Sequence, residues 1–158
     1  MTSSNGAIEV ILAGVADIPR VAPLFDAYRQ FYEQASDLPA AEAYLTDRLA
    51  RSQSVIFLAQ VPMGPAVGFT QLYPSFSSIS MRPLWILNDL FVMPEYRRSG
   101  VGRVLLQQAR AYAAGSGAAG MVLETAVTNE SAQALYESLG WKRDELFYTY
   151  ELDLRGAS

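Results

Sequence analysis

The stretch with the clearest chemical meaning is a basic, glycine-rich turn at residues 92–105, V-M-P-E-Y-R-R-S-G-V-G-R-V-L. An apolar segment ends at Val92, and an amphipathic helical pattern begins near Gly100. Glycine lets the backbone approach a ligand closely, and the N–H groups and dipole of a helix N-terminus favour anions. The arginines of the turn add positive charge. The turn therefore predicts a site for a ligand that carries phosphate.

Two common phosphate-binding motifs do not fit this turn. A Walker loop requires a lysine after its last glycine, and here Arg103 follows Gly102. A dinucleotide-binding fingerprint requires a third glycine where Leu105 stands, and it opens the first crossover unit of a fold. For R-x-x-G-x-G alone, a strand-to-helix turn with solvated arginines is an equally good interpretation. A second motif has to decide between the two.

The absence of two residue types narrows the chemistry. The chain has 158 residues, with no Cys and no His. This excludes disulfides, thiolate nucleophiles, iron–sulfur clusters, Ser-His-Asp triads and the usual zinc sites. Catalysis has to use tyrosine, carboxylates, lysine or arginine, hydroxyls, backbone amides or a hard-cation site. We predict no metal among the functional residues.

The overall composition predicts a single globular domain over residues 1–158, with residues 1–6 loose. Hydrophobic residues are 51% of the chain and charged residues 18%, which is typical of globular proteins. The net charge of −4 argues against a general nucleic-acid binder, because such binding requires neutralised phosphates. No apolar run approaches the roughly 20 residues that span a bilayer. The first apolar run contains Glu9 and lacks a basic leader, so we predict a cytoplasmic protein with no nucleic-acid or membrane partner.

The apolar periodicity predicts a mixed α/β fold that positions the glycine turn. Antiparallel strands come early in the chain and a crossover unit comes late. The strand at 84–92 is apolar on both faces and is therefore expected at the centre of the sheet. Residues 74–80 are predicted to be a Ser-rich loop. The predicted strands are 9–13, 54–61, 67–73, 84–92, 120–126 and 145–152, and the predicted helices are 17–31, 39–51, 100–114 and 129–139.

A second motif follows further along the chain. Asn129 opens the pattern N-x-x-A-x-x-L-Y-x-x-x-G-W, which ends at Trp141. Together with R-x-x-G-x-G after a strand that ends in L-F-V, it resembles the GNAT superfamily of acyl-CoA N-acyltransferases over residues 84–141. The sequence D-L-F-V followed by Y-R most resembles the polyamine (spermidine/spermine-type) and histone-tail amine acetyltransferases of that superfamily.

The resemblance implies a GNAT fold, in which a central and mostly antiparallel sheet contains two splayed parallel strands and is flanked by about four helices. Acetyl-CoA would lie in the gap between the strands at 84–92 and 120–126. Its pantetheine arm would bind the freed backbone of the first strand, and its pyrophosphate would rest on the amides of the glycine turn. The residues that the resemblance implies in binding CoA are Leu90, Phe91, Val92, Arg97, Arg98, Ser99, Gly100, Val101, Gly102, Arg103 and Asn129.

The resemblance also implies that Tyr136 is the general acid, whose hydroxyl would protonate the departing CoA thiolate. The amine would attack the thioester directly, and a backbone N–H near Phe91 or Val92 would stabilise the oxyanion, so neither Cys nor His is required. By spacing alone, Tyr136 is a core aromatic of its helix. Asn129 is likewise a helix N-cap, and it can serve both purposes.

The reaction also needs a base that takes a proton from the ammonium form of the substrate. Related polyamine enzymes carry Glu where this chain has Asn88, and an amide cannot take a proton from an ammonium substrate. Asp89 is the nearest carboxylate and is the predicted base. Strand alternation puts Asp89 on the face opposite Asn88 unless a bulge intervenes. Glu124 is a second candidate, and a purely structural role is the alternative for Asp89.

Candidate contacts for the acceptor lie outside the motifs. They are Tyr28, Tyr32, Glu33, Asp37 and the loop at 73–78. Aromatic faces combined with carboxylates suit a cationic amine. A core role for Tyr28 and surface roles for Glu33 and Asp37 explain the same residues.

We predict an N-acetyltransferase that moves an acetyl group from acetyl-CoA to a primary amine. The acceptor would be a polyamine-like small molecule or the lysine side chain of a peptide. The alternative is a non-catalytic CoA-binding sensor, which Asn88 in place of a base would favour. A homodimer is compatible with the resemblance, with the aromatic segment at 145–152 at the acceptor site or at the dimer seam.

Overall fold

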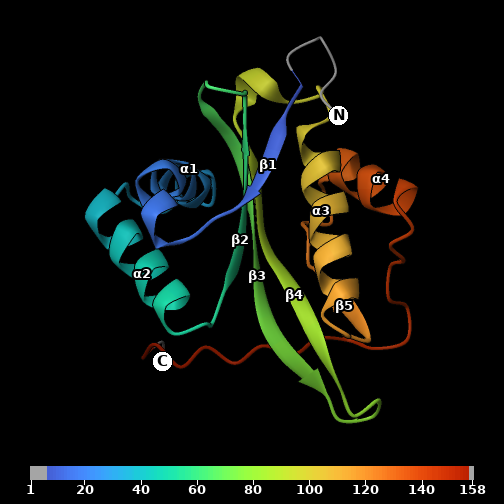
Figure 1. The fold of residues 1–158 in the computed structure, drawn as a ribbon. Helices are drawn as coiled ribbons and strands as arrows, with labels where there is room; N and C mark the ends of the chain where they lie inside the picture. The colour runs from blue at the N-terminus through green and yellow to red at the C-terminus, as the bar shows by residue number, and fades with distance from the viewer. Residues whose placement is uncertain (1–6, 157–158) are drawn as a thin grey trace. The chain divides into compact units, whose positions relative to one another are not determined.

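Five strands form one sheet, in the order β1-β2-β3-β4-β5, in the computed structural model of the chain (Figure 1). The structure describes residues 7–156, so the predicted loose segment at 1–6 lies outside the described residues. The described residues form two compact units, one ending at Glu124 and one starting at Thr125, and the sheet belongs to the first. The expectation of a single domain stays a prediction.

The elements of the first unit follow the predicted order. The strands are β1 Glu9–Leu12, β2 Val55–Gln60, β3 Ala66–Ser77, β4 Arg82–Val92 and β5 Gly120–Val122. The helices are α1 Ile18–Phe31, α2 Leu38–Ala50 and α3 Val101–Gly115, with short 3-10 helices η1 Val15–Asp17 and η2 Pro94–Tyr96. Neighbours from β1 to β4 pair antiparallel, whereas β4 and β5 pair parallel. The predicted mixed α/β class, with a mostly antiparallel sheet and one parallel pair, is confirmed.

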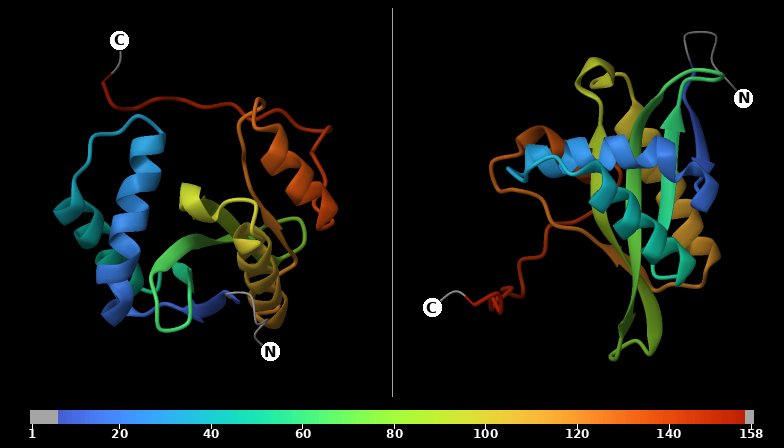
Figure 2. Two further views of the ribbon diagram at one scale, coloured as in Figure 1. Left: turned by 90° about the horizontal axis from the view of Figure 1, so that it is seen from above. Right: turned by 90° about the vertical axis from the view of Figure 1, so that its left-hand side faces the viewer.

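Helices cover both faces of this sheet, with α1 and α2 on one face and α3 on the other (Figures 1 and 2). In β2, Ile56 and Leu58 belong to the core that α1 and α2 form with the sheet. The intervening Phe57 packs its ring against Tyr112 of α3. Burial on both faces explains why β2 is a continuous apolar run. Within residues 7–156, no helix is both long and apolar enough to cross a bilayer.

The loop between α1 and α2 is anchored by the buried carboxylate of Asp26. Its Oδ2 accepts a hydrogen bond from Ser36 Oγ at 2.6 Å, and its Oδ1 accepts one from the Asp37 N–H at 2.8 Å. These hydrogen bonds lower the pKa of Asp26 below its ordinary value. Asp37 in turn caps α2, because its Oδ1 accepts from the Ala40 N–H at 3.2 Å. The start of α2 is thereby fixed relative to α1.

The hairpin of β3 and β4 is longer than predicted. Residues 74–77, predicted as part of a loop, continue β3 and pair with β4 from Pro74↔Trp85 to Ser77↔Arg82. Serine and proline are typical of loops, which explains the error. The pairing of β3 with β2 stops at Leu72↔Val55, so Pro74 lies where β3 has only one neighbouring strand. Proline is tolerated at such an edge.

The fifth strand is shorter than predicted, and its length matters for the site. A strand was expected over 120–126, but β5 ends at Val122. It pairs with β4 only from Leu84↔Gly120 to Ile86↔Val122. Because β4 continues to Val92, the pairing between the two parallel strands ends after Ile86 while β4 runs on. This is the splayed parallel pair that the resemblance implies.

The second unit has one helix in its described part, α4 Glu130–Ser138. Asn129 caps it, since its side-chain oxygen accepts from the Ala132 N–H at 3.3 Å. Gly140 follows the helix with a φ of +94°, a left-handed conformation that favours glycine. The helix predicted at 129–139 is confirmed.

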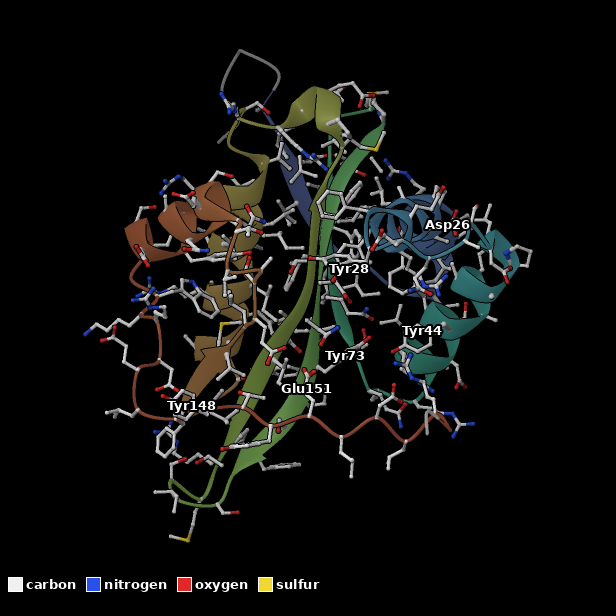
Figure 3. The ribbon with its side chains drawn as sticks, turned by 180° about the vertical axis from the view of Figure 1, so that it is seen from behind. Asp26, Tyr28, Tyr44, Tyr73, Tyr148 and Glu151 are labelled. Atoms are coloured by element: carbon white, nitrogen blue, oxygen red, sulfur yellow. The ribbon has the colours of Figure 1, made fainter. Side chains whose placement is uncertain are left out.

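The prediction of a strand at 145–152 is wrong, because the structure has no strand there. The large side chains of this segment are exposed, Tyr148 to 91% and Tyr150 to 92% (Figure 3 labels Tyr148). The segment makes local hydrogen bonds, such as the one from the Leu146 N–H to Asp144 Oδ1 at 2.9 Å. Alternating apolar residues form a strand only where a neighbouring backbone and an apolar surface receive them.

Candidate active site

A bulge in β4 breaks the alternation of its side chains at Asn88. Gln71 of β3 pairs with Asp89, and the next residue, Leu72, pairs with Leu87, so Asn88 is the extra residue of β4. A bulge lets neighbouring side chains depart from opposite-face alternation. Asn88 and Asp89 accordingly line the same pocket. The sequence predicted opposite faces for Asn88 and Asp89 unless a bulge intervened, and the structure has that bulge.

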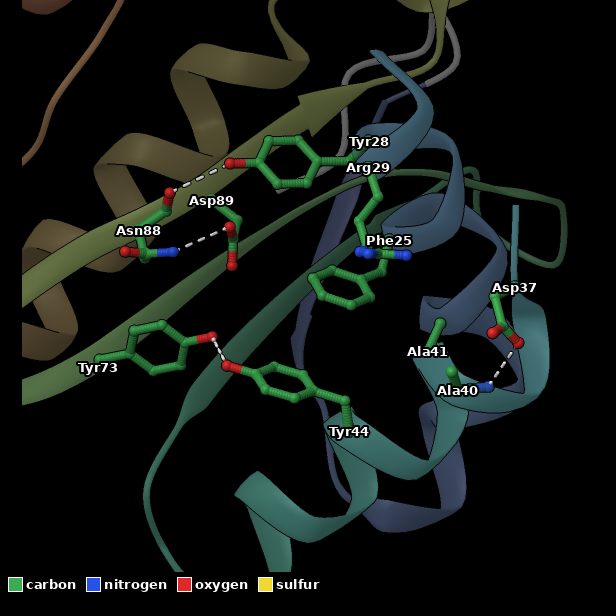
Figure 4. A pocket seen from close by; sticks show the side chains of 10 residues that line it. All are labelled: Phe25, Tyr28, Arg29, Asp37, Ala40, Ala41, Tyr44, Tyr73, Asn88 and Asp89. Carbon is green, nitrogen blue, oxygen red and sulfur yellow. Dashed lines mark hydrogen bonds between the residues drawn. The ribbon is translucent and has the colours of Figure 1, made fainter. Parts of the chain in front are cut away.

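The pocket lies between the helices α1 and α2 and the strands β3 and β4 (Figure 4). Its volume is about 570 Å³, within the range of small-molecule sites. Aromatic rings, two carboxylates and one guanidinium share its walls. The lining residues are Phe25, Tyr28, Arg29, Asp37, Ala40, Ala41, Tyr44, Tyr73, Asn88 and Asp89.

Asp89 is a buried carboxylate held by a chain of side-chain amides and hydroxyls. It is only 4% exposed, and its Oδ2 accepts from Gln71 Nε2 at 2.6 Å. Its Oδ1 accepts from Asn88 Nδ2 at 3.1 Å, and the Tyr28 hydroxyl adds a further hydrogen bond. Gln71 is itself fixed by Ser54 Oγ, which donates to Gln71 Oε1 at 2.7 Å. The carboxylate therefore has a fixed orientation.

Burial raises the pKa of Asp89 above its ordinary value, and the hydrogen bonds from Gln71, Tyr28 and Asn88 oppose that rise only in part. A buried carboxyl with a raised pKa in a cavity is the expected form of a general base. Glu124, the second candidate, is exposed beyond the end of β5 and does not line the pocket. The described residues contain no cluster of three or more side chains suited to a metal ion.

Tyrosines form the wall that faces Asp89. The ring of Tyr44 stacks on Phe25, with centroids 5.8 Å apart and planes 4° apart. The hydroxyls of Tyr44 and Tyr73 point toward one another from α2 and β3 and lie 2.8 Å apart (Figures 3 and 4). Burial and this hydrogen bond raise the pKa of Tyr73, so its hydroxyl keeps its proton. The wall therefore offers both aromatic faces and neutral hydroxyls to a ligand.

Of the residues predicted to contact the acceptor, only some line this pocket. Tyr28, Asp37 and Tyr73 line the pocket, whereas Tyr32 and Glu33 do not. Phe25, Arg29 and Tyr44 also line the pocket and were not predicted as site residues, whereas Asn88 was considered only as the residue in place of a base. Helical spacing is the signal that could have found most of them, because residues three and four apart share a face. Phe25, Tyr28 and Arg29 are related in this way on α1, as are Ala40, Ala41 and Tyr44 on α2.

The end of β4 presents backbone groups on the side away from β3. The Met93 N–H donates to the Val67 carbonyl at 2.8 Å, so the alternation of an antiparallel pair turns the backbone of Phe91 toward β3 and those of Leu90 and Val92 away. In the described part of the chain, no strand pairs with this edge after Ile86. Leu90 and Val92 are thus placed to bind an extended ligand, while Phe91 contributes a buried ring.

The glycine turn is tied to this edge by Arg97. Its Nε donates to the Val92 carbonyl at 2.9 Å, and its guanidinium lies 5.6 Å from the centroid of the Phe91 ring. Arg98 and Gly100 have φ values of +64° and +87°, and a Cβ built at Gly100 would meet no atom within 4 Å. Gly100 precedes α3 without a side-chain capping bond. This open, basic helix N-terminus fits a phosphate ligand, and it comprises Arg98, Ser99, Gly100, Val101, Gly102 and Arg103.

In the second unit, Asn129 and Tyr136 belong to the same helical segment. Asn129 makes the capping bond of α4, which is the structural role that the sequence offered for it. The half-buried ring of Tyr136 lies 6.3 Å from the ring of Trp141, tilted by 55°. Their expected roles toward CoA stay predictions.

The model of the acetyltransferase (GNAT) family matches residues 21–141, a stretch that includes the pocket, the glycine turn and α4. This chain belongs to the GNAT family. Together with its similarity to known acetyltransferases, this makes it an acetyl-CoA-dependent N-acetyltransferase.

This GNAT acetyltransferase is 48% identical to the uncharacterized N-acetyltransferase YhfO of Bacillus subtilis (strain 168) over 142 residues, 90% of this chain and 95% of YhfO. The crystal structure of a probable acetyltransferase matches it with a TM-score of 0.88 and 41% identity, covering 92% of this chain and 97% of the other. The aminoglycoside N-acetyltransferase AAC(6')-Iy, solved with CoA, has a TM-score of 0.78 and 19% identity over 96% of this chain and 99% of its own. This last likeness concerns the fold alone.

We expect Asp89→Asn to change how stability depends on pH. The pKa of Asp89 is raised in the folded chain, so the unfolded chain loses this proton at a lower pH. The free energy of unfolding of the wild type therefore falls as pH rises between the pKa of Asp89 in the unfolded chain and that in the folded chain. The variant has no carboxyl at this position and lacks this pH dependence. In urea titrations, the stability of the variant relative to wild type should increase as pH rises from about 4 and level off above the raised pKa.

Asp37→Asn is the matched control for this experiment. Asp37 is exposed and caps α2, and asparagine is an equally good N-cap. Its stability difference from wild type should show no such rise. A constant difference between Asp89→Asn and wild type across the same pH range would contradict the burial argument.

Proposed function

We propose that this acetyltransferase transfers the acetyl group directly to a primary amine bound in the pocket, with Asp89 as the proton acceptor. The observation that carries the proposal is the position of Asp89. It is a buried carboxylate on the pocket wall, and it immediately precedes Leu90, where β4 presents its free edge. The acceptor and the acyl donor would therefore meet at adjacent residues of one strand.

We also propose which residues hold the acyl donor. The outward-facing backbone of Leu90 and Val92 suits the amides of a pantetheine arm, and the uncapped N-terminus of α3 suits a pyrophosphate. Bound acetyl-CoA supplies the acetyl thioester. The proposed set is completed by Phe91, Arg97, Arg98, Ser99, Gly100, Val101, Gly102, Arg103 and Asn129.

The chain's own residues then move the protons. Asp89 takes a proton from the ammonium group, and the amine nitrogen forms a bond to the acetyl carbon as the carbon–sulfur bond breaks. Tyr136 donates its hydroxyl proton to the sulfur. The ammonium nitrogen loses two protons in all. Asp89 takes the first and passes it to solvent, and the second restores the hydroxyl proton that Tyr136 gave to the sulfur. Its raised pKa makes Asp89 a stronger proton acceptor than an exposed aspartate.

Asp89→Asn tests the proposed base. We expect kcat for acetylation to fall at least about a hundredfold, since this is the typical contribution of general acid–base catalysis. The measurement is the release of free CoA thiol with a panel of primary amines, together with the affinity for acetyl-CoA, which should stay near the wild-type value. Asp37→Asn removes another carboxylate of the same pocket and should change kcat much less. A fully active Asp89→Asn variant would remove Asp89 from the reaction.

Tyr136→Phe tests the proposed acid. Loss of the hydroxyl should lower kcat by about a hundredfold while acetyl-CoA binding is retained, because only the proton to the sulfur is lost. Tyr148→Phe, at an exposed tyrosine of the same unit, is the control and should keep the wild-type rate. If Tyr136→Phe turns over at the wild-type rate, water or another group protonates the thiolate.

The small size of the pocket favours a small-molecule acceptor over a folded protein. The polyamine-like molecule and the lysine side chain expected from the sequence remain predictions, and so does the cytoplasmic location. The amine panel above includes both kinds of acceptor.

We further propose that the enzyme is a homodimer that buries the exposed aromatic segment at 145–154. Its large side chains are at least 78% exposed, and contiguous apolar surface of this kind marks interaction sites. They are Leu146, Phe147, Tyr148, Tyr150, Leu152 and Leu154.

Light scattering tests this assembly. We expect twice the chain mass of 17.3 kDa for the wild type and the single-chain mass for a Tyr148→Ser, Tyr150→Ser variant. Ile79→Ser, at a 98% exposed residue between β3 and β4, should remain dimeric. A monomeric wild type at micromolar concentration would contradict the proposal.

A further inference from the structure

We propose that the acceptor carries a carboxylate as well as its primary amine, and that Arg29 binds this carboxylate. The inference rests on the proposed function, because it takes the pocket to be the acceptor site. It names a residue and a substrate class to which neither the motifs nor the family membership points.

Arg29 places its positive charge inside the pocket. It lies on α1, is half-buried and lines the cavity. Figure 4 shows its side chain extending from α1, whereas Asp89 enters from β4. The two charged groups thus stand on different walls of one cavity. A ligand that contacts both needs a spacer between its amine and its anionic group.

Within residues 7–156, no salt bridge is seen between the Arg29 guanidinium and a carboxylate, in contrast to Arg48, Arg51, Arg143 and Arg155. Arg29 influences Asp26 by its charge, but the oxygens of Asp26 already accept from Ser36, Asp37 and Gln30. A half-buried guanidinium in this situation keeps its donors available, and its planar fork matches a carboxylate.

The balance of charge in the pocket opposes a second ammonium group. Asp89 would be occupied by the reacting amine. The remaining charged side chains of the pocket are then the exposed Asp37 and the half-buried Arg29. The carboxylate of Asp37 is already engaged in capping α2. A diamine would bring a second cation close to Arg29 in a partly desolvated space, where like charges repel more strongly than in water. A carboxylate there forms a charge-assisted hydrogen bond instead.

A matched set of acceptors tests the inference. Linear amino acids from glycine to 6-aminohexanoate are compared with amino alcohols and diamines of equal chain length, using CoA release by the full-length enzyme. We expect the best amino acid to exceed its matched alcohol and diamine by about ten- to hundredfold in kcat/KM, the range that a hydrogen bond to a charged group supplies. The preference should lie mainly in KM, because Arg29 positions the acceptor and moves no proton.

Variants assign the preference to Arg29. In Arg29→Gln, the ratio between amino acid and amino alcohol should fall close to one, and Arg29→Lys should restore part of it. Arg51→Gln removes an exposed arginine of the surface and should leave the ratio at its wild-type value. Circular dichroism and acetyl-CoA affinity confirm that each variant is folded.

The outcomes separate this inference from the proposed function. Amine turnover without preference for the carboxylate, a preference for diamines, or a preference that survives Arg29→Gln would overturn the inference and leave the transfer reaction in place. Absence of CoA release with every amine, despite acetyl-CoA binding, would overturn the proposed function and the inference together.

Discussion

The extra residue of β4 at Asn88 is the constraint on which the site depends. Without it, strict alternation would put Asp89 and Asn88 on opposite faces of the sheet. With it, both side chains enter the cavity under α1 and α2. The pairing of β5 with β4 ends just before this point, after Ile86, so within residues 7–156 no strand covers this edge of β4 beyond the bulge. One local irregularity therefore coincides with both parts of the proposed site, the cavity proposed for the acceptor and the strand edge proposed for the acyl donor.

Burial gives this arrangement its chemistry. A carboxylate is costly to bury, and the enzyme offsets the cost with fixed donors from Gln71, Asn88 and Tyr28 without removing the rise in pKa. Gln71 is held in turn by Ser54, so a network of side-chain hydrogen bonds orients the Asp89 carboxylate. On the helical side, Asp26 fixes the loop from which α2 begins, and α2 carries Tyr44 into the cavity. The pocket thus depends on two buried carboxylates whose pKa values shift in opposite directions. Hydrogen bonds lower the pKa of Asp26, and burial raises the pKa of Asp89.

The sequence predicted those parts of the fold whose signals are local. The glycine turn, the cap at Asn129 and the apolar strands could be located because spacing and residue type determine them. The length of the β3–β4 hairpin could not, since Pro74 and its serines are typical of loops and only the partner strand makes them a strand. The strand predicted at 145–152 is wrong for the converse reason: its residues alternate as in a strand, yet the described part of the second unit contains no strand. In the site, Asp89 could be named from the motif. Helical spacing groups Arg29 with Phe25 and Tyr28, and Tyr44 with Ala40 and Ala41, but only the packing of α1 and α2 shows that these faces line a pocket.

We propose that Asp89 accepts the proton of the acceptor amine because burial raises its pKa. Carbon-13 NMR of the Asp89 carboxyl, with the Asp89→Asn spectrum for assignment, measures that pKa directly and can be compared with the pH profile of kcat/KM. We expect a pKa clearly above the ordinary value of about 3.9 and a limb of the kinetic profile at the same pH that is missing in Asp89→Asn. A carboxyl that titrates at the ordinary value, or a pH profile unchanged by the substitution, would contradict this proposal.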